Sequence, residues 1–204
     1  MILTAAARGA SLRRMWRTLS FAILLGFAPV AEAAPSHAPA AESGPAHDVD
    51  RLYQRLARTR FPDEAAGIIA EIDHLRLQSG SDTADLLLGR ALKARASSDM
   101  PLALKLFDAV VSLYPDWPQA WSERATARFQ TGDSSGAMAD IAQTLKRDPR
   151  DIDALSGLAA MMLDAGNPEA ALKVYNSALK LAPAYEPLKE ARARAQTEVW
   201  SRSP

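Results

Sequence analysis

Three prolines at equal intervals constrain the fold of this 204-residue chain more than any other feature. Pro115, Pro149 and Pro183 lie 34 residues apart, and each follows a mainly apolar stretch. Counting back from them divides this part of the chain into three units, residues 84–117, 118–151 and 152–185. A period of about 20–50 residues indicates a fold in which each unit packs only against its neighbours.

Small and large side chains recur at fixed positions within the three units. Alanine occupies positions 8 and 20 in every unit: Ala91, Ala125 and Ala159, then Ala103, Ala137 and Ala171. Large residues occupy positions 4, 24 and 28: Leu87, Trp121 and Leu155, then Phe107, Ile141 and Tyr175, then Val111, Leu145 and Leu179. Gly132 and Gly166 share one phase, where a left-handed residue would end the first helix of a unit. The first unit has Ser98 at that phase, which makes its turn a departure from the pattern.

This pattern resembles the tetratricopeptide repeat (TPR) family, in which small residues at positions 8 and 20 let two antiparallel helices approach closely. The large residues then fill the space between neighbouring hairpins. The resemblance implies an all-α fold, a TPR-type α-solenoid of antiparallel helix hairpins with a C-terminal capping helix. An ordinary bundle with alanine-rich faces would not repeat its turns at one phase.

Position 7 departs from the family pattern, which usually has leucine there. The chain has Arg90 and Arg124 in the first two units, and only Leu158 conforms. We expect each arginine to lay its stem on the core and to reach a carboxylate such as Asp108 or Asp140. These arginines are interpreted as structural.

Residues 48–83 are interpreted as a degenerate N-terminal helical hairpin that ends the stack. Tyr53, Leu56, Ala57 and Ala65 match positions 4, 7, 8 and 20, but the turn between the helices is four residues shorter than the family's. Atypical ends are expected in a solenoid, because a terminal unit has only one neighbour.

Residues 186–204 are predicted to form the capping helix. One apolar stripe at helical spacing would cover the last repeat, made of Leu188, Ala191, Ala195 and Val199. Trp200 is expected to be buried beneath the chain end.

Residues 1–33 have the pattern of a secretory signal peptide. Arginines precede a short apolar stretch, and a small-x-small cleavage site precedes Ala34. The apolar stretch is shorter than the roughly 20 residues of a spanning helix, so we predict cleavage, a periplasmic location and no stable membrane span. Retention as a membrane anchor, and a start at Met15 instead of Met1, stay open. Residues 34–47 are predicted to be a flexible linker, because proline and small residues dominate them.

Composition and motifs argue against several functions. The 24 basic and 24 acidic residues balance, so no basic surface for nucleic acid is expected. The absence of cysteine excludes disulfides and thiolate metal sites. His74 is the one histidine that follows the linker, and no nucleophile elbow, zinc-protease motif or phosphate-binding glycine loop accompanies it. We therefore predict no enzyme activity, no cofactor and no metal.

The TPR resemblance implies that positions 2, 5, 9 and 12 of the first helix in each unit line a concave groove. Apolar, hydroxyl and acidic residues hold these positions: Asp85, Leu88, Leu92 and Arg95, then Gln119, Ser122, Thr126 and Phe129, then Asp153, Ser156, Ala160 and Leu163. Such a surface suits a protein or peptide segment with an apolar anchor. Leu88 and Leu92 have an alternative role, which is packing against the N-terminal hairpin.

One binding mode of the family is argued against. TPR domains that bind chaperone C-termini hold a carboxylate with Lys and Asn at positions 5 and 9, and this chain has neither residue there. The chain is similar to small secreted TPR proteins of Gram-negative bacteria. We predict a non-catalytic periplasmic protein–protein interaction scaffold in cell-envelope assembly or integrity. The alternative is a membrane-tethered subunit of an outer-membrane or cell-wall machine, and an enzyme is less favoured.

Overall fold

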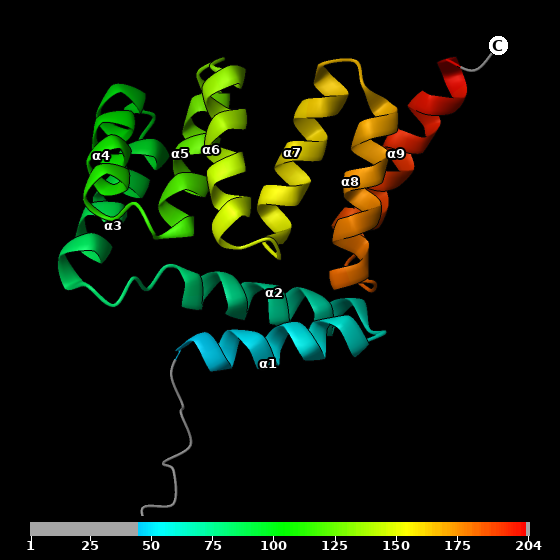
Figure 1. The fold of residues 1–204 in the computed structure, drawn as a ribbon, viewed down its shortest axis with the longest axis horizontal. Helices are drawn as coiled ribbons and strands as arrows, with labels where there is room; N and C mark the ends of the chain where they lie inside the picture. The colour runs from blue at the N-terminus through cyan, green and yellow to red at the C-terminus, as the bar shows by residue number, and fades with distance from the viewer. Residues whose placement is uncertain (1–44, 203–204) are drawn as a thin grey trace, which may run out of the picture. The chain divides into compact units, whose positions relative to one another are not determined.

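A computed structural model describes residues 45–202, and this part of the chain is all helical, without strands. The helices are α1 (Pro45–Arg58), α2 (Pro62–Arg76), α3 (Asp82–Ala96), α4 (Met100–Leu113), α5 (Pro118–Gln130), α6 (Ser134–Arg147), α7 (Ile152–Asp164), α8 (Pro168–Leu181) and α9 (Glu186–Arg202). Helices α3 to α9 stand side by side, and α1 and α2 cross beneath them (Figure 1). The predicted signal peptide and residues 34–44 of the predicted linker lie outside the described residues.

Each of the three units holds one pair of packed helices: α3/α4, α5/α6 and α7/α8. The alanines at positions 8 and 20 are all buried, so the two helices of a pair approach closely. Phe107, Ile141 and Tyr175 at position 24 are buried as well. The predicted all-α solenoid of antiparallel hairpins is confirmed.

The turn within each repeat consists of a residue in the left-handed conformation followed by a helix-capping residue. Gly132 and Gly166 have φ angles of 86° and 76°, and Ser98 takes the same left-handed conformation with φ 62°. The next residue then caps the second helix of the pair with its side chain. Its oxygen accepts a hydrogen bond from a backbone N–H in the first turn: Asp99 from Leu102 (3.2 Å), Asp133 from Gly136 (2.8 Å) and Asn167 from Ala170 (3.3 Å).

The N-terminal hairpin does not extend the stack at the first repeat. Its buried residues share one hydrophobic cluster with α7, α8 and α9, at the other end of the solenoid: Leu52, Tyr53, Leu56, Ala65, Ile68, Ile69 and Ile72 pack with Ile152, Tyr175, Ala182, Ala184 and Leu188. Ala57, which the sequence matches to a buried position 8, is exposed. The connection to α3, residues 77–81, contains Gly80 at φ 81°, a left-handed conformation that lets the chain change direction.

Helix α9 caps the last repeat. Leu188, Ala191 and Ala195 are buried, as the apolar stripe predicts. The predicted burial of Trp200 is wrong, because 69% of this residue is exposed. The fully buried part of the stripe ends at Ala195, so the last turn has less of the stack to pack against. Within the part of the chain that the structure describes, no helix has both the length and the apolar content needed to cross a membrane.

Candidate functional site

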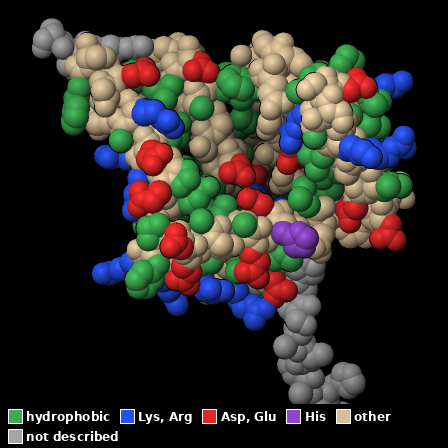
Figure 2. Space-filling view, turned by 180° about the vertical axis from the view of Figure 1, so that it is seen from behind, with side chains coloured by type: hydrophobic (Ala, Val, Ile, Leu, Met, Phe, Trp, Pro, Cys, Tyr) green, Lys and Arg blue, Asp and Glu red, His purple; other side chains and the backbone are tan. Residues whose placement is uncertain are grey.

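The first helices of the three repeats, α3, α5 and α7, carry the predicted groove positions, and we call the surface of these positions the groove. Figure 2 shows one face of the molecule with a hollow near its centre, above α1 and α2. Acidic side chains gather at the base of this hollow. The predicted groove residues differ in how far they remain available to a partner.

Helix α3 contributes little free surface to the groove. The Asp85 carboxylate accepts hydrogen bonds from the backbone N–H and hydroxyl of Ser79, at 2.8 and 2.6 Å. Leu88 is 1% exposed, so its predicted place on the groove surface is wrong. It belongs to one hydrophobic cluster with Leu77, the residue that follows α2. The other buried residues of the N-terminal hairpin lie in a different cluster. Leu92 is partly buried in the same cluster.

The remaining α3 position is engaged with α5. Arg95 Nη1 lies 2.7 Å from Glu123 Oε2. The Gln119 amide donates a hydrogen bond to Glu123 Oε1 at 2.9 Å. Glu123 is therefore neutralised within the protein, and the wall between α3 and α5 is fixed by these contacts.

The surface that stays open lies on α5 and α7. Thr126 is exposed, and its hydroxyl donates to the Ser122 carbonyl oxygen at 3.2 Å. Phe129 is 36% exposed. Asp153 is exposed, while the other three α7 positions are partly exposed: Ser156, Ala160 and Leu163. Asp153 and Leu163 are ten residues apart on one helix, which separates the acidic and apolar ends of the groove by about 15 Å.

Helix α2 adds an acid that the sequence analysis missed. Asp73 is partly buried, and burial together with the negative charges of Asp153, Asp151 and Glu123 raises its pKa to about 7. Asp153 is exposed at its surface, but the protein around its carboxylate partly desolvates it, and this desolvation and then the charge of Asp151 raise its pKa. Burial, Asp153 and Asp73 raise the pKa of the Tyr185 hydroxyl. Groups on α2, α5 and α7 and in the loop before α9 therefore interact electrostatically, and no period in the sequence points to α2 as a member of this group.

A buried network fixes α2 beneath the repeats. Arg76 Nη2 lies 2.7 Å from a carboxylate oxygen of both Asp148 and Asp151. The Trp117 indole donates to the Arg76 carbonyl oxygen at 3.0 Å, and the Tyr53 hydroxyl donates to the Arg150 carbonyl oxygen at 2.8 Å. The positive charge of Arg76 lowers the pKa of both Asp73 and Asp153. Its ion pairs, however, are with Asp148 and Asp151.

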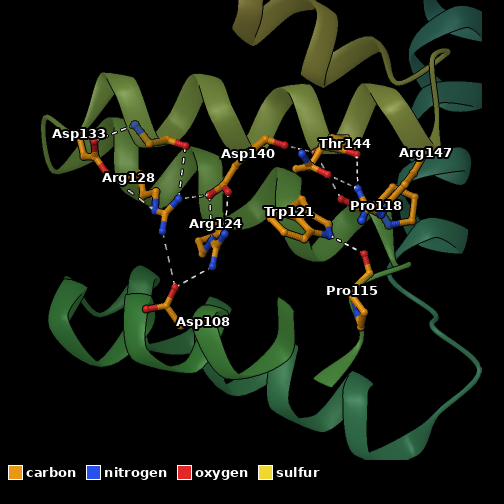
Figure 3. Close-up of polar contacts among 12 residues, drawn as sticks. Asp108, Pro115, Pro118, Trp121, Arg124, Arg128, Asp133, Asp140, Thr144 and Arg147 are labelled. Carbon is orange, nitrogen blue, oxygen red and sulfur yellow. Dashed lines mark hydrogen bonds and ion pairs between the residues drawn. The ribbon is translucent and has the colours of Figure 1, made fainter. Parts of the chain in front are cut away.

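The largest arginine network outside the groove is structural. Arg124 binds both oxygens of Asp140 at 2.9 and 2.7 Å and Asp108 at 2.8 Å, and Arg128 also reaches Asp140 at 2.9 Å (Figure 3). The prediction for Arg124 is confirmed, whereas Arg90 is exposed.

The histidine of α2 does not belong to a catalytic cluster within the described part of the chain. His74 is exposed, and its Nε2 lies 3.5 Å from the Gln78 amide nitrogen. Among residues 45–202 no group of His, Asp and Glu is arranged to hold a metal ion.

Comparison with known sequences gives a consistent result. A family model described as "Tetratricopeptide repeat" matches residues 86–149 and 122–186, and both matches begin after the N-terminal hairpin. A TPR repeat-containing protein of Rhizobium etli is 38% identical over 144 residues, which cover 71% of this chain and 71% of the relative.

Solved structures share the fold. The first TPR of Spaghetti (RPAP3) bound to the HSP90 peptide SRMEEVD has a TM-score of 0.54 and 19% identity, covering 57% of this chain and 94% of that chain. The Yersinia enterocolitica type III secretion chaperone SycD, in complex with a peptide of the translocator YopD, has a TM-score of 0.52 and 20% identity, covering 59% and 92%. At these identities the likeness shows the fold alone.

Proposed function

Because the chain belongs to the tetratricopeptide repeat family, we propose that it is a non-catalytic scaffold that holds a segment of a partner protein in the groove. The observation that carries this proposal is the uncovered apolar surface of Phe129, together with the partly exposed Leu163 at the equivalent position of the next repeat. An aromatic side chain open to solvent within a concave face is a suitable anchor for a peptide. Two proteins of similar fold have been solved with peptides bound, which supports this use of the solenoid.

The proposed place of action is the periplasm, in the assembly or integrity of the cell envelope. The signal-peptide pattern of residues 1–33 supports this location. Mass spectrometry of the protein purified from its cells tests it. A mature N-terminus at Ala34 would support the periplasmic form, whereas a retained leader would support a membrane-tethered subunit.

Replacing Phe129 and Leu163 together by alanine tests the groove as the binding surface. We expect at least a tenfold lower yield of captured partner, with helicity by circular dichroism unchanged, because neither side chain is fully buried. Leu102→Ala with Met138→Ala is the matched control, since these exposed apolar residues lie on α4 and α6. Equal capture by the groove variant and the wild type would show that the partner binds elsewhere.

A further inference from the structure

The acids around the base of the groove differ in whether the protein neutralises them. Glu123 is paired with Arg95, and Asp148 and Asp151 are paired with Arg76. The Arg76–Asp151 ion pair at 2.7 Å joins the end of α2 to the start of α7. Asp73 lies three residues before Arg76 and Asp153 two residues after Asp151, so the two acids flank this junction. The charge of Asp153 acts on Asp73, and within residues 45–202 neither acid forms an ion pair with a basic side chain. Two like charges that lie close together without an ion-pair partner of their own repel each other, so a cation placed between them would relieve the repulsion.

The apolar end of the groove defines the other half of the surface. Phe129 and Leu163 both occupy position 12, towards the C-terminal ends of α5 and α7, while Asp153 is the second residue of α7. Hydroxyl-bearing residues separate the two ends. The groove therefore runs from an acidic end beside α2 to an apolar end about 15 Å away.

We infer that the groove binds a cationic polypeptide segment, with a lysine or arginine between Asp73 and Asp153 and an apolar side chain against Phe129 and Leu163. This inference rests on the proposed function and adds the chemistry of the partner. The spacing corresponds to roughly four or five residues of extended peptide. Helix α2, which lies outside the repeats, becomes part of the binding site.

The charge of this surface favours one class of segment over its opposite. The HSP90 peptide on Spaghetti, SRMEEVD, contains two glutamates and one aspartate. A peptide of that composition would bring carboxylates towards Asp73 and Asp153 and would be repelled. A basic segment gains from the same charges and binds more weakly at high salt.

Three matched 12-residue fluorescent peptides test the inference on the full chain. Each has leucine at the same positions, and the remaining positions are lysine, glutamine or glutamate. By fluorescence anisotropy, we expect the lysine peptide to bind at least tenfold more tightly than the glutamate peptide at 50 mM salt. Raising the salt to 300 mM is expected to reduce this difference. No measurable binding of the lysine peptide, or equal binding of the glutamate peptide, would overturn the inference.

Charge-removing variants locate the binding site. Asp73→Asn with Asp153→Asn is expected to raise the Kd for the lysine peptide at least tenfold, and relief of repulsion should leave the fold intact. Glu71→Gln is the matched control, because Glu71 is an exposed acid on the same helix and lines a surface with Asp48 and Arg51 on α1. An unchanged Kd in the double variant, or an equal loss in the control, would refute the role of the two acids.

Two further measurements separate the possible outcomes. A cation between the two acids lowers their pKa values, so binding of the lysine peptide near pH 7 should release protons, measured by calorimetry in buffers of different ionisation enthalpy. If Phe129→Ala with Leu163→Ala abolishes binding of all peptides while the acid variants change nothing, the proposed function stands and the cationic partner is wrong. If spermidine alone binds as tightly as the lysine peptide, the assignment to a polypeptide is wrong.

Discussion

At the scale of single residues, Ser98 adopts a backbone conformation that is unfavourable for a residue with a side chain. It occupies the left-handed position that glycine holds in the other two repeats. A side chain in this conformation costs about 1–2 kcal/mol, and glycine gives back part of that through its freedom in the unfolded chain. We expect Ser98→Gly to raise the free energy of unfolding by about 0.5–1 kcal/mol in urea denaturation. Ser97→Gly, at φ −87°, should give no gain, and an equal gain there would show that the turn geometry is not the cause.

The ion pairs of Arg124 are expected to contribute more to stability than the Ser98 turn does. The Asp140 side chain is 2% exposed, while the Asp108 side chain, which binds the same guanidinium, is 58% exposed. Removing a buried partner leaves an uncompensated charge, so Asp140→Ala should lower the free energy of unfolding by about 3 kcal/mol. Asp108→Ala should cost less than about 1 kcal/mol, because an exposed pair is screened by solvent. Similar losses in the two variants by urea denaturation would contradict this assignment.

At the scale of helices, the sequence predicts what is repeated and misses what is not. The three helix pairs, their alanine contacts and their turns follow from residues whose phase recurs, so each position is supported by two others. The place of α1 and α2 depends on contacts such as Arg76 with Asp148, 72 residues apart, and no period marks them. The same reason explains the site. Asp153 could be predicted from its repeat position, whereas Asp73 joins it only because the hairpin folds back.

Ala137, which is buried between paired helices, and Ala57, which is exposed on α1, give a test at the scale of helices. Ala137→Asp places a charge where α5 and α6 touch, and it is expected to abolish cooperative thermal unfolding, because the site is fully buried. Ala57→Asp changes a residue that looks equivalent in the sequence but is exposed, and it should change the melting temperature little. A large loss for Ala57→Asp would mean that α1 packs as a repeat after all.

At the scale of the whole described unit, α1 and α2 tie separate repeats together. Trp117, at the end of the first repeat, donates a hydrogen bond to α2. Asp148 and Asp151, at the end of the second repeat, bind Arg76, and Tyr53 donates to the Arg150 carbonyl oxygen. In a simple solenoid each unit contacts only its neighbours. Here the hairpin adds contacts across several units, so its docking affects both the stability of the stack and the base of the groove.

The pH dependence of the free energy of unfolding tests how α2 packs beneath the repeats, because it depends on the pKa of Asp73. Folding raises the pKa of Asp73 from 3.8, its ordinary value, to about 7. The folded state therefore binds the proton of this carboxyl more tightly than the unfolded chain does. The free energy of unfolding therefore falls as the pH rises between about 4 and 7. Asp73→Asn removes this contribution. The variant should match the wild type near pH 4 and exceed it by about 2 kcal/mol at pH 8, a value reduced for partial solvent screening. Urea denaturation across this range measures the difference. Glu71→Gln should show no such growth with pH. A constant offset for Asp73→Asn would mean that burial and the charge of Asp153 do not raise the pKa of Asp73 in the folded protein.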